Sequence, residues 1–380
     1  MSSSLFKRLS EWVAFDTQNP SGDERPMVAE LGRELAALGA DTVEIVEVAP
    51  HAMVYARFGD TPPRLLLNAH VDTVPANTGY SSSPHTLVQR GSRLVGLGAA
   101  DTKGAIAAIM DALAIVHGEG RYPRGIGILF SGDEERRGTC IRRFLEDSAL
   151  AAGIERAIVC EPTGCAVGAR HRGIGAAEAS VTSPGGHSSR ADHLPNPIAI
   201  LARAAVALDD FGRRQRDQGP SGFEGLCMNV AAIDGGLAFN VIPSRATLRV
   251  SLRPAPGGDM TALLGECEAL ARAAAAPAAI DWTVVNANPP FHTRDVAAFE
   301  ALLGARAARP VDLAFWTEAA LLGEAGIDAV VFGPGRIEQA HAADEFVELA
   351  ELEEARDTFL RIFRAHARAH AGGGGPAPAS

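Results

Sequence analysis

The chain has 380 residues, of which 47% are hydrophobic and 21% charged, a composition typical of a folded globular protein that is long enough for two domains. Its formal net charge of -11 argues against a nucleic-acid partner, because binding a phosphate backbone requires a basic surface. No stretch is long and apolar enough to span a membrane, and the first twenty residues lack the apolar run of a secretion signal, so we expect a cytoplasmic protein without a membrane partner.

The first part of the chain predicts alternating helices and strands. Apolar positions at helical spacing predict two helices, around residues 5–15 and 28–35, separated by the turn signal Asn19-Pro20-Ser21-Gly22. Apolar runs then predict strands in VEIVEV, MVYARF, RLLLNAH and GIGILFSG, and an Ala- and Ile-rich helix over about residues 104–116. This alternation predicts an α/β fold with a mainly parallel sheet sandwiched by helices.

The pattern changes in the middle of the chain. Alternating strand patterns, AAEASVTS, NVAAIDGG and RATLRVSLRP, surround two Ala-rich helices near residues 195–210 and 259–274. This combination predicts a separate α+β unit. The α/β pattern then resumes with the strand AVVFGP and a final helix over about residues 349–369.

These changes predict the domain organisation. A main domain is expected from residues 1–172 and 289–371, with residues 173–288 inserted into it as the α+β domain. The tail over residues 372–380, GGGGPAPAS, is predicted to be disordered. Five scattered cysteines without CxxC spacing predict free thiols in a reducing compartment: Cys140, Cys160, Cys165, Cys227 and Cys267.

Histidine and carboxylate side chains follow the ends of predicted strands, where the sites of α/β sheets gather. His70 and Asp72 end the strand in LLLNAHVDTVP, and residues two apart in an extended chain point the same way. The carboxylate is therefore placed to orient the imidazole of a metal ligand, although an HxD pair alone is more often structural. Asp101 lies in a glycine-flanked turn before a helix, where an ordinary helix cap is the competing interpretation.

Further acidic residues follow two other predicted strands. Asp133, Glu134 and Glu135 come directly after GIGILFSG, and three adjacent acids repel one another unless cations neutralise them, with a solvated acidic turn as the alternative. Glu161 ends the strand in RAIVCEP, and His341 lies in a loop after a glycine-proline turn. Each is inconclusive alone. Together, one histidine and one terminal carboxylate for each cation, with a shared aspartate, would make a workable two-zinc site.

In order and spacing, these motifs resemble those of the acetylornithine deacetylase and succinyl-diaminopimelate desuccinylase family of metallohydrolases. The similarity covers nearly the whole chain and is carried by HVDTVP, GLGAADTKG, SGDEER, CEPTG, GGHSS, NVIP and AHAADEF. It implies an enzyme that hydrolyses a linear amide with two zinc ions per chain, with cobalt as a substitute.

The resemblance also implies roles for individual residues. The metal ligands would be His70 and Glu161 for one zinc ion, Glu135 and His341 for the other, and Asp101 for both. Asp72 would hold His70 in place. Glu134 would be the general base, taking a proton from the attacking water and returning it to the leaving amine.

In the resembling family the inserted domain forms the homodimer and acts as a lid, which assigns that part to residues 173–288 here and makes residues 1–172 and 289–371 the catalytic domain. His187 of the GGHSS motif would reach the partner's site and donate to the developing oxyanion, with a histidine in a surface turn as the alternative. Asn240, Arg253 and Thr317 would contact the substrate, Arg253 by binding its carboxylate through two hydrogen bonds. A structural role is the alternative for Asn240 and Arg253.

The segments FWTEAALL and VVFGPGRIEQAH favour the acetylornithine deacetylase branch, and within it the group that acts on N-acetylcitrulline. We therefore expect an N-acyl amino acid as substrate, N-acetylornithine or N-acetylcitrulline, in arginine biosynthesis. The sequence departs from that group at Leu313-Ala314 and Arg136-Arg137, which leaves the substrate open. The alternatives are an N-succinyl-amino-acid desuccinylase or a broad aminoacylase or dipeptidase on the same site, and, outside enzymes, a silent binding protein that kept the fold.

Overall fold

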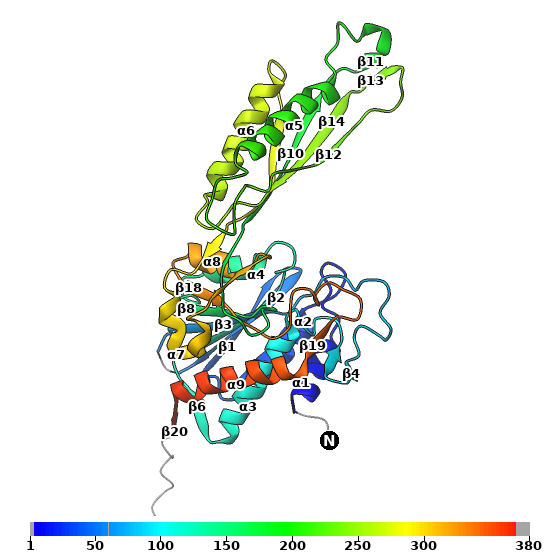
Figure 1. Cartoon of the computed structure of the whole chain (residues 1–380). Helices are drawn as coiled ribbons and strands as arrows, with labels where there is room; N and C mark the ends of the chain where they lie inside the picture. The colour runs from blue at the N-terminus through cyan, green and yellow to red at the C-terminus, as the bar shows by residue number, and fades with distance from the viewer. Residues whose placement is uncertain (1–3, 60, 370–380) are drawn as a thin grey trace, which may run out of the picture. The chain divides into compact units, whose positions relative to one another are not determined.

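The computed structural model describes residues 4–59 and 61–369 (Figure 1). It divides into two compact units. The first comprises the described residues up to Ala169, Thr293–Val311 and those from Thr317 onward, and the second comprises Arg170–His292 and Asp312–Trp316. The assignment of a catalytic and a dimerisation domain to these parts stays a prediction, and the tail predicted over residues 372–380 lies outside the described residues.

The first unit is built on a sheet with a parallel centre. Its four central strands lie side by side in the order β7 (Ile126–Ser131), β3 (Leu65–His70), β8 (Arg156–Val159) and β18 (Asp328–Val331). β2 (His51–Phe58) and β1 (Thr42–Val48) extend the sheet antiparallel beyond β7, and β9 (Gly168–His171) pairs antiparallel with β18. The predicted parallel sheet is confirmed at its centre, and the strands at its edges run antiparallel.

Helices cover both faces of this sheet, which explains why the central strands are continuous apolar runs. One face packs against α1 (Ser4–Val13), α2 (Arg25–Ala37), α3 (Lys103–Gly118) and α9 (Leu349–His366). α4 (Thr139–Glu146) and α8 (Ala319–Glu324) lie on the other face (Figure 1). α3 is buried over most of its length because it lies between the sheet and α9.

Short elements complete the first unit and place its loops. β19 (Phe346–Glu348), β5 (Arg93–Val95) and β4 (Val88–Arg90) form a small sheet, so the segment before α9 is joined to the segment before α3. Other short elements of this unit are β6 (Arg121–Pro123), α7 (Glu300–Leu303) and β20 (Ala367–Ala369). β16 (Phe291–His292) belongs to the second unit, and β17 (Val311–Leu313) begins in the first unit and ends in the second.

The second unit is an antiparallel sheet covered by helices on one face. The strand order is β12 (Asn229–Gly235), β14 (Arg245–Leu252), β10 (Ile174–Thr182) and β15 (Asp281–Asn288). Alternate residues of β10 and β14 are buried against α5 (Pro197–Arg214) and α6 (Met260–Ala275), which confirms both helices predicted there. β11 (Gly186–His187) and β13 (Val241–Ile242) form a separate ladder.

Two composition-based predictions can be compared with the structure. All five cysteines are free thiols, as predicted, and Cys227 alone among them is exposed. None of the helices in the described ranges has the length and apolar content that crossing a bilayer requires.

Candidate metal centre

The candidate site lies at one edge of the first unit's sheet. His70 is the last residue of β3, Glu161 follows β8 by two residues, and Glu134 and Glu135 follow β7. These three strands are parallel, so their carboxyl ends bring the side chains to the same edge. Two loops supply the other members of the site, Asp101 before α3 and His341 between β18 and β19.

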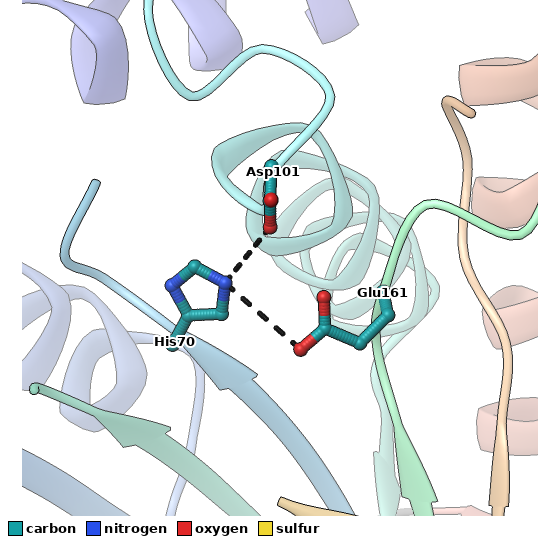
Figure 2. Close-up of side chains that lie close together, drawn as sticks. All are labelled: His70, Asp101 and Glu161. Atoms are coloured by element: carbon teal, nitrogen blue, oxygen red, sulfur yellow. Dashed lines mark hydrogen bonds and ion pairs between the residues drawn. The ribbon is translucent and has the colours of Figure 1, made fainter. Parts of the chain in front are cut away.

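The first group of potential ligands is buried. Nε2 of His70 lies 2.9 Å from Oδ1 of Asp101 and 3.9 Å from Oε1 of Glu161. Figure 2 shows both carboxylates turned toward the same edge of the imidazole ring. One ligand atom from each residue lies within 4.8 Å of the other two, a spacing at which a single cation can contact all three.

The second group shares Asp101 with the first. The other oxygen of Asp101, Oδ2, lies 3.3 Å from Nε2 of His341, which also lies 3.1 Å from Oε1 of Glu135. These ligand atoms again lie within 4.8 Å of one another. The side chain of His341 is 47% exposed, so solvent reaches the centre from this side. Asp101 therefore offers one oxygen to each group, the geometry expected of a residue between two cations.

The carboxyl groups of the centre are buried and close together, so their negative charges are unfavourable unless something neutralises them. Burial raises the pKa of Glu134 and of Glu161 well above the usual value, and neighbouring carboxylates raise both further. For Asp101, burial also favours the neutral form, but hydrogen bonds with His341 and His70 outweigh it and lower its pKa. Protons or cations can neutralise such a cluster, and carboxylate oxygens with imidazole nitrogens are a donor set that Zn²⁺ accepts. The residues present thus fit two zinc ions.

The two histidines respond to the same charges. Burial disfavours the charged form of His70, but hydrogen bonds with Asp101 and Asp72 prevail and hold its pKa well above the ordinary value. Hydrogen bonds with Asp101 and Glu135 raise the pKa of His341 to about 10. A histidine must be neutral to bind a metal, so protons and metal ions compete for both rings.

Asp72 fixes the first histidine and the acidic loop together. Nδ1 of His70 donates to the backbone oxygen of Asp72 at 2.9 Å and lies 3.5 Å from its Oδ1, which leaves Nε2 available as the ligand atom. The backbone N–H groups of Glu134 and Glu135 donate to the two carboxylate oxygens of Asp72, each at 3.1 Å. One buried side chain thus orients a potential ligand from β3 and two acidic residues after β7.

Asn19 takes part in this network, although the sequence indicated only a turn at this position. Its buried side-chain nitrogen donates to Oδ2 of Asp72 at 3.0 Å and to Oδ1 of Asp133 at 2.9 Å. The amide therefore ties the first loop of the chain to the acidic loop after β7. Nothing in the local sequence pairs Asn19 with residues this distant, so only the fold identifies this contact.

Thr317 and Glu318 lie at the start of α8, on the face of the sheet that α4 also covers. Glu318 is buried and accepts a hydrogen bond of 2.7 Å from Oγ of Ser131, and burial raises its pKa to about 7. Its charge also raises the pKa of Glu134. Thr317, a predicted substrate contact, is buried, and its hydroxyl accepts from the backbone N–H of Ala319 at 3.3 Å. The local sequence FWTEAALL gave no sign of a role for Glu318.

Two glycines in the turn after β18 pack closely against the loops that carry ligands. A Cβ atom on Gly333 would lie 2.7 Å from the backbone oxygen of Glu161. A Cβ atom on Gly335 would lie 3.0 Å from Cα of Ala100, next to Asp101. Both distances are shorter than van der Waals contact, so any larger residue would displace a ligand loop.

The other predicted site residues belong to the second unit. His187 is exposed in β11, opposite Val241 of β13, and its Nδ1 accepts from the backbone N–H of Ser189 at 3.2 Å. The backbone oxygen of Asn240, also exposed, accepts from the N–H of Ser188 at 3.0 Å, so His187 and Asn240 lie on the same hairpin-like ladder. Arg253 is exposed after β14. Their roles stay predictions.

Comparisons with known proteins agree with this geometry. The model of the peptidase family M20/M25/M40 matches residues 66–365. The chain is 34% identical to an N-acetyl-L-citrulline deacetylase from Xanthomonas campestris pv. campestris, over 94% of this chain and 97% of that protein. It is 33% identical to an acetylornithine deacetylase from Edwardsiella ictaluri, over 81% of each.

Solved structures share the fold at lower identity. An M20 family metallo-carboxypeptidase from Sulfolobus solfataricus superposes with a TM-score of 0.76 at 17% identity, covering 96% of this chain and 100% of that chain. A dinuclear metal binding peptidase of the M20 family from Bacillus subtilis superposes with a TM-score of 0.66 at 16% identity, covering 95% and 98%. The predicted α/β fold and family resemblance are thereby confirmed.

Proposed function

The chain belongs to the peptidase family M20/M25/M40 and is a metal-dependent amide hydrolase, and from this premise we propose that it removes the acetyl group of N-acetylcitrulline or N-acetylornithine with two zinc ions. The observation that carries the proposal is the pair of ligand groups that share Asp101. The identity to two deacetylases over most of the chain supports acetyl as the acyl group.

In this proposal the two ligand groups hold the metal ions. His70, Asp101 and Glu161 would hold one ion, and Asp101, Glu135 and His341 would hold the other. Both sets contain one imidazole and two carboxylates, and Co²⁺ can replace Zn²⁺ in such sites because it accepts the same donors. When bound, the ions supply Lewis acidity, which acidifies water and polarises the amide carbonyl.

Glu134 acts as the general base. Its carboxylate takes the proton of the attacking water and passes it to the nitrogen of the leaving amino acid, so that this nitrogen departs as an amine. The raised pKa of Glu134, caused first by burial, helps the group to hold the proton between the two transfers. Asp72 keeps the base in place because it accepts the backbone N–H of Glu134 at 3.1 Å.

We also propose that the second unit forms a homodimer through residues 173–288, and that His187 acts in the partner's site. Exposed apolar side chains of this unit support an interface. Seven of the nine large apolar residues that the described part of the chain exposes lie there: Val206, Ile233, Leu237, Phe239, Val241, Val284 and Val285. Light scattering coupled to gel filtration should give twice the mass of the chain, and a monomer with full activity would contradict the proposal.

Within the same proposal, Asn240 and Thr317 contact the substrate and Arg253 binds its carboxylate. A guanidinium group can donate two parallel hydrogen bonds to a carboxylate, so Arg253→Lys should raise KM more than it lowers kcat. We place the reaction in the cytoplasm and in arginine biosynthesis. Five free thiols support a reducing compartment.

A substrate series tests the function directly. Zinc-loaded protein should hydrolyse N-acetylcitrulline or N-acetylornithine with the highest kcat/KM, ahead of N-acetylmethionine, N-succinyl-diaminopimelate and a neutral dipeptide. A preference for the succinyl compound would instead identify a desuccinylase, and comparable rates on all substrates would identify a broad aminoacylase or dipeptidase. Failure to hydrolyse any of them in the zinc-loaded state would reject the proposed reaction.

A further inference from the structure

The carboxylate of Glu345 is buried against the loop that leads to Asp101. Its Oε2 accepts the backbone N–H of Gly98 at 2.9 Å, and its Oε1 accepts those of Ala100 at 2.9 Å and Asp101 at 3.1 Å. The residue is 2% exposed, so water does not replace these bonds when they are lost. Glu345 therefore determines where the backbone of Asp101 lies.

The backbone of Glu345 holds the same loop from a second side. Its carbonyl oxygen accepts the N–H of Gly96 at 2.9 Å, and the next residue, Phe346, pairs with Val95 where β19 meets β5. Side chain and backbone together fix residues 96–101 as one rigid segment. Such a concentration of bonds on one side chain exceeds what capping a helix requires, since α3 begins only at Lys103.

Glu345 also lies on the loop that carries His341. Outside this loop, Asn77 donates to the backbone oxygen of His341, and the N–H of Ser81 donates to Asp344 at 2.9 Å. Inside it, the side chain and the backbone of Glu345 accept hydrogen bonds from residues 96–101. The residue thus joins the two loops that meet at the second ligand group, where Oδ2 of Asp101 lies 3.3 Å from Nε2 of His341.

We propose that Glu345 is a positioning residue that sets Asp101 against His341 and thereby completes the second metal site. This inference rests on the proposed two-metal function. Three backbone donors converge on two acceptor oxygens, so a glutamine at this position would place an N–H₂ group against an N–H group. An alanine would leave all three donors without a partner. Both changes should loosen the approach of Asp101 to His341 and leave β3 and Glu161 in place.

The test is a Co²⁺ titration of metal-free protein, followed by visible absorption, because the spectrum reports the geometry around each ion. The parent protein should bind two ions per chain. Glu345→Gln and Glu345→Ala should still bind the first, while the Kd of the second rises about 10- to 100-fold, as is typical when a group that orients ligands is changed. Glu348→Gln is the matched control, because Glu348 lies three residues further on and pairs with Arg93 at the surface.

Hydrogen exchange of the metal-free proteins reports directly on the backbone of residues 96–101, independently of activity. Residues 96–101 should exchange faster in both Glu345 variants and at the parent rate in Glu348→Gln. If Glu345→Ala fails to fold, the glutamine variant still decides the matter. Two sites of parental affinity, or unchanged exchange in residues 96–101, would overturn the role of Glu345. A parent protein that binds no second ion would instead refute the two-metal function on which the inference rests.

Discussion

Oδ2 of Asp101 lies 3.3 Å from Nε2 of His341, although one residue precedes the inserted second unit in the sequence and the other follows it. Asp101 is the member common to both ligand groups, so its loss should affect both ions. Asp101→Ala should bind neither zinc ion tightly, whereas His341→Ala should retain one. Elemental analysis after dialysis measures the stoichiometry, and equal metal contents in the two variants would contradict the shared role of Asp101.

Glu134→Gln should retain both metal ions and lose turnover. The amide cannot accept the proton of the attacking water, and general-base contributions of this kind amount to about 100- to 10,000-fold in rate. Glu146→Gln, at the exposed end of α4, is a matched control that should keep the parental kcat. The measurement is kcat beside zinc content, and a variant with both ions and parental kcat would show that another residue is the base.

The metal-free protein should lose stability as the pH rises above neutrality. The pKa of His341 rises from 6.5 to about 10 on folding because of its hydrogen bonds with Asp101 and Glu135. Between these values the folded chain binds more protons than the unfolded chain, so this stabilisation is complete below about pH 6.5 and is lost as the pH approaches about 10. The raised pKa values of Glu134 and Glu161 act in the same direction.

Thermal unfolding followed by circular dichroism checks this dependence. In the presence of a chelator, Tm should fall between about pH 6 and pH 10, and His341→Gln should flatten the decline because the variant lacks the titrating ring. Zinc-loaded protein should decline less, since bound ions replace the protons. A chelated protein whose Tm is constant over this range would disprove the protonation of the metal-free site.

Gly333→Ala should weaken the first metal site without changing any ligand. Its Cβ would lie 2.7 Å from the backbone oxygen of Glu161, so the loop after β8 must move. We expect the affinity for the ion at His70 to fall about 10-fold or more, as for changes that displace a ligand. Gly265→Ala in α6 is the control, because nothing lies within 4 Å of its added Cβ. Isothermal titration measures the zinc affinity of both variants. Equal affinities of Gly333→Ala and Gly265→Ala would contradict the expected displacement of the Glu161 loop.

The sequence predicted the centre of the fold because its signals there are local. Continuous apolar runs predicted β3 and β7 as buried strands, and the structure places helices on both of their faces. The antiparallel edges were not predicted, since the direction of β1 and β2 depends on which strand they pair with and not on their own composition.

For the site, sequence patterns identified the residues that the structure brings together, from His70 to His341. Their recurrence after strand ends made this possible, because parallel strands deliver such residues to one edge. The contacts of Asn19 and Glu345 could not be predicted in the same way. Both act through hydrogen bonds to residues far away in the chain, and their local surroundings look like an ordinary turn and an ordinary acidic loop.

The first unit is formed by chain segments that come before and after the second unit, which affects the order in which its parts are made on the ribosome. When translation has reached His292, the emerging chain contains β3, β7 and β8 but lacks β18 and the loop with His341. The edge of β8 that later pairs with β18 is then open, and all the potential ligands except His341 have been synthesised while the sheet is still incomplete. Capture of the second ion must therefore await nearly the whole polypeptide.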